Sequence, residues 1–412
     1  MKLKPNVKEV LPRAVPTDYR LGIDGWSFSK EKLAERQEDG TRKLLTLDVS
    51  ISPDQFVEKV NQGDRKGLVR RVNKFYDSIC PHNCPGCFEK GDVTNYLLSF
   101  EDIQNYIEQG LELGLESIKF LGPGELIANP DLFKILDYLD EKDIKTIIFT
   151  KGGTLGDDEL AKRYQGMSSE ELVKKVCSYD NTRFGINFRT FDEKKANNST
   201  NSQASNYARA RNRAVELLAK EGMNSDLYSQ RLGLIFTPVT ADSIDDTLEV
   251  FKWGTERNIP VTVTPTMVSG RGKKLMKEAQ TPEFQEKLVQ LYTDINTYLV
   301  EIGALTIDQL KEEGVSSYAG TTPCTQLSCG MFVRKDGVVQ FCPGNDSGQF
   351  KIADDVRAEP LRNIWGKHAA KIDDKWGTGS VLNNGCVKDG YSIPVKLYDD
   401  VLKRLDVDGK KD

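Results

Sequence analysis

Apolar positions between about residues 100 and 265 alternate between the spacing of helices and the spacing of strands. Behind Ser99, apolar side chains recur every three or four residues, which predicts a helix with one buried face. Short apolar runs predict strands at 117–122, 145–150, 183–188, 231–237 and 260–265. Further helices are predicted from Asn129 onward, with Asn129 as the cap, and at 157–178, 204–221 and 243–257. Strands that alternate with helices indicate a parallel sheet and an α/β fold.

The first 70 residues allow two interpretations. Strand-like stretches occur at 20–28 and 43–51, and 54–77 is compatible with one or two helices. These residues could form a small cap domain. Alternatively, 44–49 is the first strand of the main sheet, followed by an insertion. Counting that strand gives six βα units, which predict an open or partial (β/α)6 barrel of the TIM type with its chemistry at the C-terminal ends of the strands.

The pattern changes again after the last predicted strand. Apolar residues at helical spacing predict an amphipathic helix at 281–303 that packs against the barrel. After about residue 315, glycine, threonine, cysteine and short β segments indicate a second module. The predicted division is 1–70 as an N-terminal extension or cap, 71–270 as the barrel, 271–315 as a helical linker and 316–412 as the second module.

Composition narrows the class of protein. The 412 residues are 38% hydrophobic and 29% charged, which is enough for a packed core under a well-charged surface. The net charge of -5 gives no support for nucleic-acid binding. No apolar stretch is long enough to span a membrane and the N-terminus lacks an apolar signal core, so we expect a cytoplasmic protein.

Cysteines are the strongest chemical signal. Three of the eight fall in one short loop, Cys80-Pro-His-Asn-Cys84-Pro-Gly-Cys87. A loop of this length can hold three irons of a four-iron cluster and leave the fourth iron open. The alternative is a partial zinc site with His82 as a fourth ligand. With only two histidines in the chain, a histidine-based metal centre is not expected.

Four predicted strand ends carry glycine or polar residues. They are Gly122-Pro-Gly124-Glu125, Thr150-Lys151-Gly152-Gly153, Asn187-Phe-Arg189, and Thr262–Thr266 leading into 269–273. Glycine lets a backbone approach a ligand, and a carboxylate can bind an ammonium group. Gly-Pro-Gly alone is also an ordinary turn. The C-terminal ends of parallel strands lie together at one barrel mouth. The occurrence of such residues at four strand ends is therefore more informative than any one of them.

A second cysteine set lies in the C-terminal module. Its members are Cys324, Cys329, Cys342 and Cys386. An Asp-Gly turn at 336–337 between two apolar runs predicts a hairpin that brings cysteines to one point. Four thiolates suit an iron–sulfur cluster or zinc. Cys177, at the end of a predicted helix, is expected at the opposite rim of the barrel as a buried structural thiol.

These motifs resemble the radical S-adenosylmethionine (radical SAM) superfamily over roughly residues 72 to 270. The matching features are the three-cysteine loop, Gly-Pro-Gly-Glu in place of the family's Gly-Gly-Glu-Pro, and the Thr-Lys-Gly strand end. The departures are Gly86, where an aromatic residue is usual, Lys151, where Asn is common, and Arg189, where Asp is common.

The resemblance implies a cofactor site. Cys80, Cys84 and Cys87 would hold a 4Fe–4S cluster whose open iron binds the amino and carboxylate groups of S-adenosylmethionine. Gly122, Gly124 and Glu125 would contact its methionine amino end. Asn187 stands where many members place a serine that contacts the cofactor. Lys151 or Arg189 would bind a substrate or cofactor carboxylate, or else both are salt-bridged structural cations.

The second module resembles the auxiliary-cluster domain called SPASM or, in its shortened form, twitch. This implies a second 4Fe–4S cluster on Cys324, Cys329, Cys342 and Cys386, with a role in electron transfer. The expected electron donor is a flavodoxin or ferredoxin.

The implied activity is reductive cleavage of S-adenosylmethionine to a 5′-deoxyadenosyl radical, which abstracts hydrogen from a substrate. We expect a small polar metabolite that is oxidised or epimerised. The alternative is a maturase acting on a ribosomally made peptide, but residues 1–70 are short for a leader-binding domain. A third possibility is an iron–sulfur or zinc scaffold without catalysis.

Overall fold

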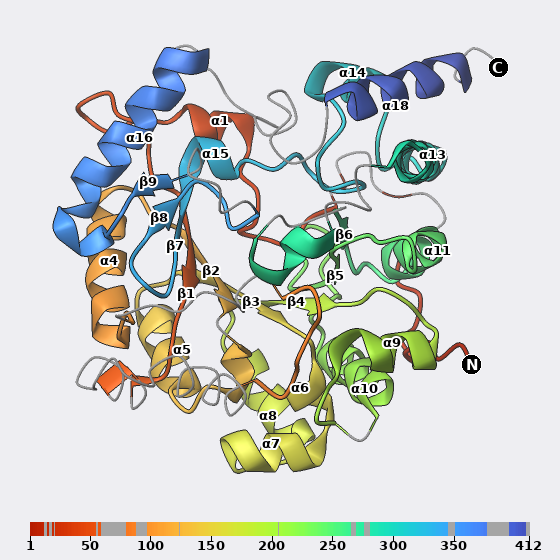
Figure 1. Cartoon of the computed structure of the whole chain (residues 1–412), viewed down its shortest axis with the longest axis horizontal. Coiled ribbons are helices and arrows are strands. Elements are labelled where there is room, and N and C mark those ends of the chain that lie inside the picture. The colour runs from red at the N-terminus through yellow and green to blue at the C-terminus, as the bar shows by residue number, and fades with distance from the viewer. Residues whose placement is uncertain are drawn as a thin grey trace.

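A single nine-stranded sheet organises the computed structural model, in the order β6-β5-β4-β3-β2-β1-β7-β8-β9 (Figure 1). The structure describes residues 1–11, 15, 19, 21–54, 57–58, 80–87, 97–122, 124–204, 206–264, 269–275, 281–344, 351–376 and 395–408. The strands are β1 (Thr46–Ser50), β2 (Ser117–Gly122), β3 (Lys145–Thr150), β4 (Thr182–Asn187), β5 (Leu232–Phe236), β6 (Val261–Val263), β7 (Gly330–Val333), β8 (Val339–Gln340) and β9 (Lys351–Ala353). Strands β1 to β6 pair in parallel, which confirms the α/β partial barrel.

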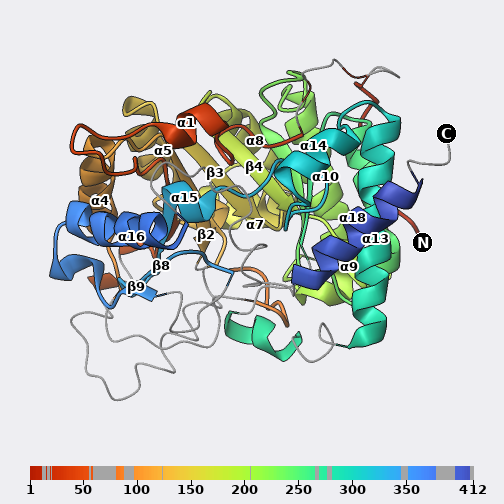
Figure 2. The same cartoon turned by 90° about the horizontal axis from the view of Figure 1, so that it is seen from above.

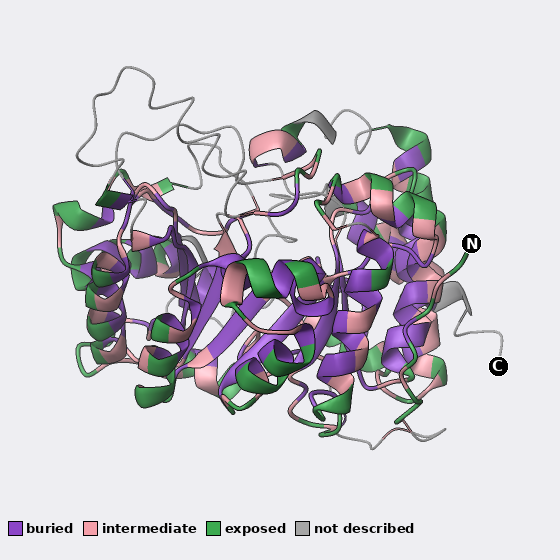
Figure 3. Cartoon of the chain, turned by 90° about the horizontal axis from the view of Figure 1, so that it is seen from below, coloured by how far each residue is buried: buried purple, intermediate pink, exposed green. Residues whose placement is uncertain are grey.

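Helices cover the sheet and leave their polar faces outward, while the barrel strands are mostly buried (Figure 3). Along the barrel the helices are α4 (Phe100–Glu112), α5 (Leu132–Glu141), α6 (Gly153–Gly156), α7 (Asp158–Gln165), α8 (Ser169–Cys177), α9 (Glu193–Thr200), α10 (Tyr207–Lys220) and α11 (Ile244–Thr255). Outside this series are α1 (Lys30–Ala34), α13 (Pro282–Glu301), α14 (Ile307–Glu313), α15 (Gln326–Cys329), α16 (Leu361–Trp376) and α18 (Val395–Asp408). Short 3₁₀ helices occur at η1 (Leu126–Ala128), η2 (Gly270–Leu275) and η4 (Val356–Ala358).

Local capping signals place most helix starts. Ser99 caps α4 through a capping box with Asp102, as the polar pattern predicts. The helix expected to be capped by Asn129 begins later, at Leu132, because the Asn129 side chain instead accepts a bond from the backbone N–H of Asp131 (2.8 Å). The single helix predicted at 157–178 is divided into α7 and α8, because Gly166 adopts a left-handed conformation and ends α7.

The N-terminal residues resolve the two interpretations in favour of the strand. β1 pairs in parallel with β2, so 44–49 does contain the first strand of the main sheet. The strand predicted at 20–28 is wrong: in its described part, Ile23 forms only an isolated bridge to Gln230. The neighbouring Asp24 side chain is instead drawn to Lys145 and Arg183 at the barrel bottom. Most of the helical stretch predicted at 54–77 lies outside the described residues.

The C-terminal module continues the barrel sheet. β7 pairs in parallel with β1, and β8 pairs with β7 in the predicted hairpin, which is confirmed. Its turn needs Gly337, whose φ of 85° is left-handed. Seen from above, α16 lies beside α4, and α13 and α18 pack together on the far side (Figure 2). The apolar face of α13 is buried as predicted. None of the described helices is both long and apolar enough to cross a membrane.

Candidate active site at the barrel mouth

Glu125 lies at the barrel mouth, three positions after the last residue of β2. Its carboxylate accepts hydrogen bonds from the Thr150 hydroxyl and from the backbone N–H of Lys151 (2.6 Å), so the end of β3 fixes its position. Burial raises the pKa of Glu125 to about 7, although these bonds and the Lys151 charge act in the opposite direction. A buried carboxylate held in this way is prepared to bind a cationic group.

The glycines on either side of Pro123 allow the backbone after β2 to pack closely at the mouth. The Gly122 carbonyl accepts the N–H of Ile51 (2.7 Å), which joins the ends of β2 and β1. Gly124 has a φ of 80°, a conformation that glycine adopts at little cost. Pro123 lies outside the described residues.

His82 anchors the three-cysteine loop to this mouth. Its imidazole is buried against Gly153, where an added Cβ would lie 2.8 Å from Cε1. Its Nε2 stands 3.6 Å from a Glu125 oxygen, and its ring meets that of Tyr207 edge to face at 5.5 Å. His82 therefore docks the loop onto α6, a role that the spacing of the cysteines did not predict.

Backbone hydrogen bonds hold the same loop from two further sides. The N–H of Asn83 donates to the Thr200 carbonyl (2.9 Å), and the N–H of Gln203 donates to the Pro81 carbonyl (2.7 Å). Arg271, beyond β6, donates its backbone N–H to the Cys87 carbonyl and its guanidinium to the Asn83 side chain, both at 2.9 Å. The segment after β6 thus reaches the cysteine loop, in line with the expected gathering of strand ends.

The three thiols of the loop are half-buried, and the Cys80 thiol lies close enough to Glu125 to be affected by its charge. Burial raises the pKa of the Cys80 thiol, and the charges of Glu125, Cys84 and Cys87 raise it further. Within the described residues, no three His, Cys, Asp or Glu side chains are close enough together to hold a metal ion. The donor set fits a cluster by its chemistry, since three thiols share one loop, and assembly requires only that they close on one another.

The end of β4 contributes the other predicted polar residues. Asn187 donates from its side chain to the Thr237 carbonyl at the end of β5 (3.1 Å). Arg189 is half-buried and donates to the Ser199 carbonyl at 3.4 Å. Burial lowers the pKa of Arg189, while the nearby Tyr207 and Cys84 oppose this change. Lys151 follows β3, which pairs in parallel with β4, so Glu125, Lys151, Asn187 and Arg189 all lie at the C-terminal edge of the sheet.

Arg211 of α10 is a further cation at the mouth that the sequence did not reveal. Its guanidinium lies 3.6 Å from the centre of the Phe188 ring and donates to the side chain of Asn212. Burial lowers its pKa to about 10, so the group remains charged. Its sequence context, an amphipathic helix with arginines at 209, 211 and 213, gave no signal to single it out.

The C-terminal cysteines occupy the module beyond β1. Cys329 is buried beside Leu33 and Leu45, and burial raises its pKa to about 12. The backbone N–H of Gly344 donates to the sulfur of Cys342 (3.3 Å). Cys324 is half-buried, and Cys386 lies outside the described residues. The described cysteines of this set likewise form no group of three side chains close enough together to hold a metal ion.

Cys177 lies at the opposite rim, as predicted. It ends α8, and its carbonyl accepts a bond from the guanidinium of Arg231 at the start of β5 (3.2 Å). The thiol is half-buried against the core, and burial raises its pKa to about 12. This position is remote from the C-terminal ends of the strands.

Residues 78–279, from the cysteine loop to the segment after β6, match the family model described as Radical SAM superfamily. The chain carries a radical SAM domain. This domain makes the chain an enzyme and implies S-adenosylmethionine and a 4Fe–4S cluster as cofactors. No curated protein sequence matches the chain.

Solved structures share the fold of the radical SAM domain and its extension. Native anSMEcpe with bound AdoMet and Kp18Cys peptide is 15% identical, with a TM-score of 0.53 and coverage of 88% of this chain and 98% of that chain. Streptococcus suis SuiB bound to precursor peptide SuiA is 15% identical, with a TM-score of 0.52 and coverage of 85% and 73%. SuiB bound to S-adenosylmethionine is 15% identical at a TM-score of 0.49, and this chain spans only 66% of that chain's length.

Proposed function

We propose that this enzyme reductively cleaves S-adenosylmethionine at the mouth of the barrel and abstracts hydrogen from a small polar metabolite, in an oxidation or an epimerisation. The observation that carries this proposal is the placement of the Glu125 carboxylate, fixed by β3 and adjacent to the three-cysteine loop. A carboxylate for an ammonium group and three thiols for a cluster are thereby combined in one site.

Cys80, Cys84 and Cys87 are proposed to hold the 4Fe–4S cluster. When bound, the cluster and S-adenosylmethionine supply one-electron cleavage and hydrogen abstraction. The protein's share is to orient the cofactor. Glu125 would accept a hydrogen bond from the cofactor's amino group, and Gly122 and Gly124 would let the adjacent backbone approach it.

The remaining proposed cofactor contacts come from β3 and β4. Asn187 presents its side chain at the end of β4, where it already bonds the end of β5. Lys151 and Arg189 are cations able to bind a carboxylate, and Arg189 can do so in bidentate fashion. His82 and Arg271 are positioning residues, because they hold the loop without being proposed to touch the cofactor.

A second 4Fe–4S cluster is proposed for Cys324, Cys329, Cys342 and Cys386 in a SPASM- or twitch-like module spanning about 316–412. Two observations support a functional link with the barrel. The hairpin β7–β8 extends the barrel sheet, and the Ser269 hydroxyl, beyond β6, donates to the Pro343 carbonyl next to Cys342 (2.8 Å). Electron transfer to or from the substrate is the proposed role, with a flavodoxin or ferredoxin as the external donor.

The N-terminal residues favour a metabolite over a leader-bearing peptide. In its described part this segment packs along the barrel: the N–H of Leu3 donates to the Phe191 carbonyl (2.8 Å), and Asp24 closes the barrel bottom. A peptide substrate is the second candidate, because SuiB and anSMEcpe were each solved with a peptide.

Iron analysis of anaerobically reconstituted protein tests the cluster assignment. We expect about eight irons per chain, and about four after Cys80, Cys84 and Cys87 are all changed to alanine, with loss of 5′-deoxyadenosine formation. Cys177→Ala is the matched control and should change neither value. About four irons in the parent protein that persist in the triple variant would show that only the C-terminal site is loaded and would overturn the radical mechanism.

A further inference from the structure

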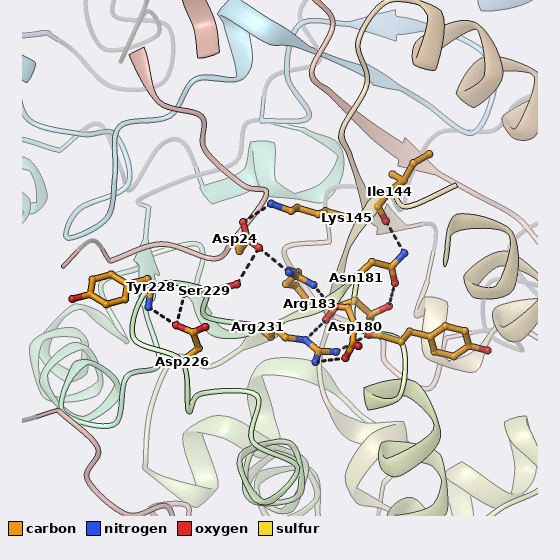
Figure 4. A network of polar contacts seen from close by, with 12 residues as sticks. Asp24, Ile144, Lys145, Asp180, Asn181, Arg183, Asp226, Tyr228, Ser229 and Arg231 are labelled. Carbon is orange, nitrogen blue, oxygen red and sulfur yellow. Dashed lines mark hydrogen bonds and ion pairs between the residues drawn. The ribbon is translucent and has the colours of Figure 1, made fainter. Parts of the chain in front are cut away.

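Arg189 is a half-buried cation two positions after the end of β4, and it forms no ion pair with the described residues. Its guanidinium donates to the Ser199 carbonyl (3.4 Å). Because a guanidinium carries five N–H donors, most of them find no acceptor in the described part of the chain. Near the other end of the same strand, Arg183 pairs with Asp24 (2.7 Å) in the network of the barrel bottom (Figure 4). Arg189 therefore lacks the internal counter-charge that Arg183 has.

The carbonyl that Arg189 uses lies at the end of α9, next to the carbonyl that holds the cysteine loop. Ser199 and Thr200 are consecutive, and the Thr200 carbonyl accepts the backbone N–H of Asn83 (2.9 Å). Asn83 directly precedes Cys84. The last turn of α9 thus binds both the Arg189 guanidinium and the backbone in front of Cys84.

Tyr207 of α10 connects the same two regions from a second side. Its ring meets the His82 imidazole of the loop edge to face, with the ring centres 5.5 Å apart. Its hydroxyl donates to the carbonyl of Asn187 at the end of β4 (3.5 Å). The segment that carries Arg189 is therefore tied to the cysteine loop through α9 and, independently, through α10.

The charges of Arg189 and Cys84 act on each other at this junction. Burial lowers the pKa of Arg189, while the charges of Tyr207 and Cys84 oppose that change. The pKa of Tyr207, which burial raises, is affected by both Cys84 and Arg189, with opposite signs. At such separations inside a protein, a unit charge is weakly screened. Arg189 is therefore placed to stabilise negative charge at the Cys84 side of the loop.

The Cys80 side of the loop has the opposite environment. Burial raises the pKa of the Cys80 thiol, and the charge of Glu125 raises it further. Negative charge is thus disfavoured beside Glu125 and favoured beside Arg189. Arg189 stands where Asp is common in the family, so the charge at this position is reversed in this chain.

We propose, on the basis of the function proposed above, that Arg189 supplies the counter-charge for the 4Fe–4S cluster of the three-cysteine loop and raises its reduction potential. One electron from the external donor reduces the cluster and adds one negative charge, which the guanidinium stabilises. Net charge and hydrogen bonds to the sulfurs set the potential of such clusters, and an arginine contributes to both. Reduction by a flavodoxin or ferredoxin is thereby made easier.

A redox titration followed by electron paramagnetic resonance tests this role on the reconstituted protein. The signal followed is the one that changes when S-adenosylmethionine is added, because the cofactor binds to an open iron. Arg189→Gln keeps a donor for the Ser199 carbonyl and removes the charge. We expect the ratio of reduced to oxidised cluster at a fixed potential to fall about tenfold, which is about 59 mV for one electron. Arg189→Met is a second neutral variant and should show the same fall.

Two further variants separate the charge from other effects. Arg189→Lys keeps the charge and should leave the ratio within about threefold of the parent. Lys195→Gln is the matched control, since it also removes a cation from α9, but an exposed one that pairs with Asp246 (2.9 Å). It should leave the ratio within about twofold. Iron content and the calorimetric affinity for S-adenosylmethionine are measured for each variant.

Three results would overturn the proposal. An unchanged potential in both neutral variants would show that the charge does not act on the cluster. An equal fall in Arg189→Lys and Arg189→Gln would make Arg189 a structural anchor of α9. A weaker affinity for S-adenosylmethionine at unchanged potential would assign Arg189 to the cofactor carboxylate. All three require a parent signal that responds to S-adenosylmethionine and leave the proposed function standing. Absence of that signal in the parent would refute the proposed function itself and, with it, the counter-charge.

Discussion

The two ends of the barrel use similar residues under different charge balance. At the bottom, Asp24 from the N-terminal segment satisfies Lys145 and Arg183. At the mouth, Lys151 and Arg189 follow the ends of the same two strands, and neither forms an ion pair with a carboxylate of the described residues. The nearby carboxylate of Glu125 accepts its hydrogen bonds from the Thr150 hydroxyl and from the backbone N–H of Lys151.

The difference between the two ends helps to tell charged groups that stabilise the fold from charged groups that bind a ligand. A cation with an internal partner contributes to closing the fold, and it needs no ligand. A buried cation or carboxylate without an opposite internal charge is destabilising until a ligand arrives, and such groups collect at functional sites. On this criterion the bottom network is structural and the mouth is the binding site.

The largest effect is expected for Glu125→Gln at the mouth. The amide keeps the shape but loses the negative charge that accepts a hydrogen bond from the cofactor's amino group, so 5′-deoxyadenosine formation should fall about 100-fold or more, equivalent to about 2.7 kcal/mol. Cleavage is measured by chromatography on reconstituted protein with matched iron content. Activity within twofold of the parent would remove Glu125 from the cofactor site.

The next effect is expected for Asp24→Asn at the bottom. It leaves Arg183 buried without a negative partner, and because the Asp24 side chain is itself partly exposed, the free energy of unfolding should fall by about 2.5 kcal/mol in urea titrations. Cofactor cleavage per folded molecule should not change. A variant of normal stability but reduced cleavage would place the bottom network in the catalytic machinery and contradict the comparison.

The smallest effect is expected in the pH dependence of the free energy of unfolding, to which Glu125 at the mouth and Asp24 at the bottom contribute with opposite signs. The pKa of Glu125 is raised from 4.5 to about 7, so between these values the unfolded chain is ionised while the folded chain keeps its proton. Stability should therefore fall by about 2 kcal/mol as pH rises through this window. The pKa of Asp24 is lowered, so its contribution is present at neutral pH and is lost only as pH falls below the ordinary value of 3.8.

Urea unfolding of cluster-free protein at pH 5 and pH 8 checks this sign. The free energy of unfolding of Glu125→Gln is compared with that of the parent at each pH. This difference should favour the variant by about 2 kcal/mol more at pH 8 than at pH 5. Asp24→Asn is the control, and its free energy of unfolding should differ from that of the parent by the same amount at both pH values. An equal offset for Glu125→Gln at both pH values would show that this carboxyl does not titrate in the window.

Local patterns determined the elements that depend on near neighbours. The bounds predicted for β2 and β3 coincide with the observed strands, and the start of α4 follows from Ser99 and its capping partner. The Asp-Gly turn of the C-terminal hairpin was likewise encoded locally. The spacing of Cys80, Cys84 and Cys87 identified the chemistry, because cluster ligands within one loop require no distant partner.

Only the tertiary structure decided the features that depend on distant contacts. β1 could be recognised as the first strand only from its pairing with β2, which lies about 70 residues further along the chain. The stretch at 20–28 has the composition of a strand. In the folded chain, however, Asp24 forms ion pairs with Lys145 of β3 and Arg183 of β4, which hold this stretch at the barrel bottom. The sequence shows which residues are cations. Whether a cation has a carboxylate partner is a property of the folded chain, and this is what separates Lys145 from Lys151.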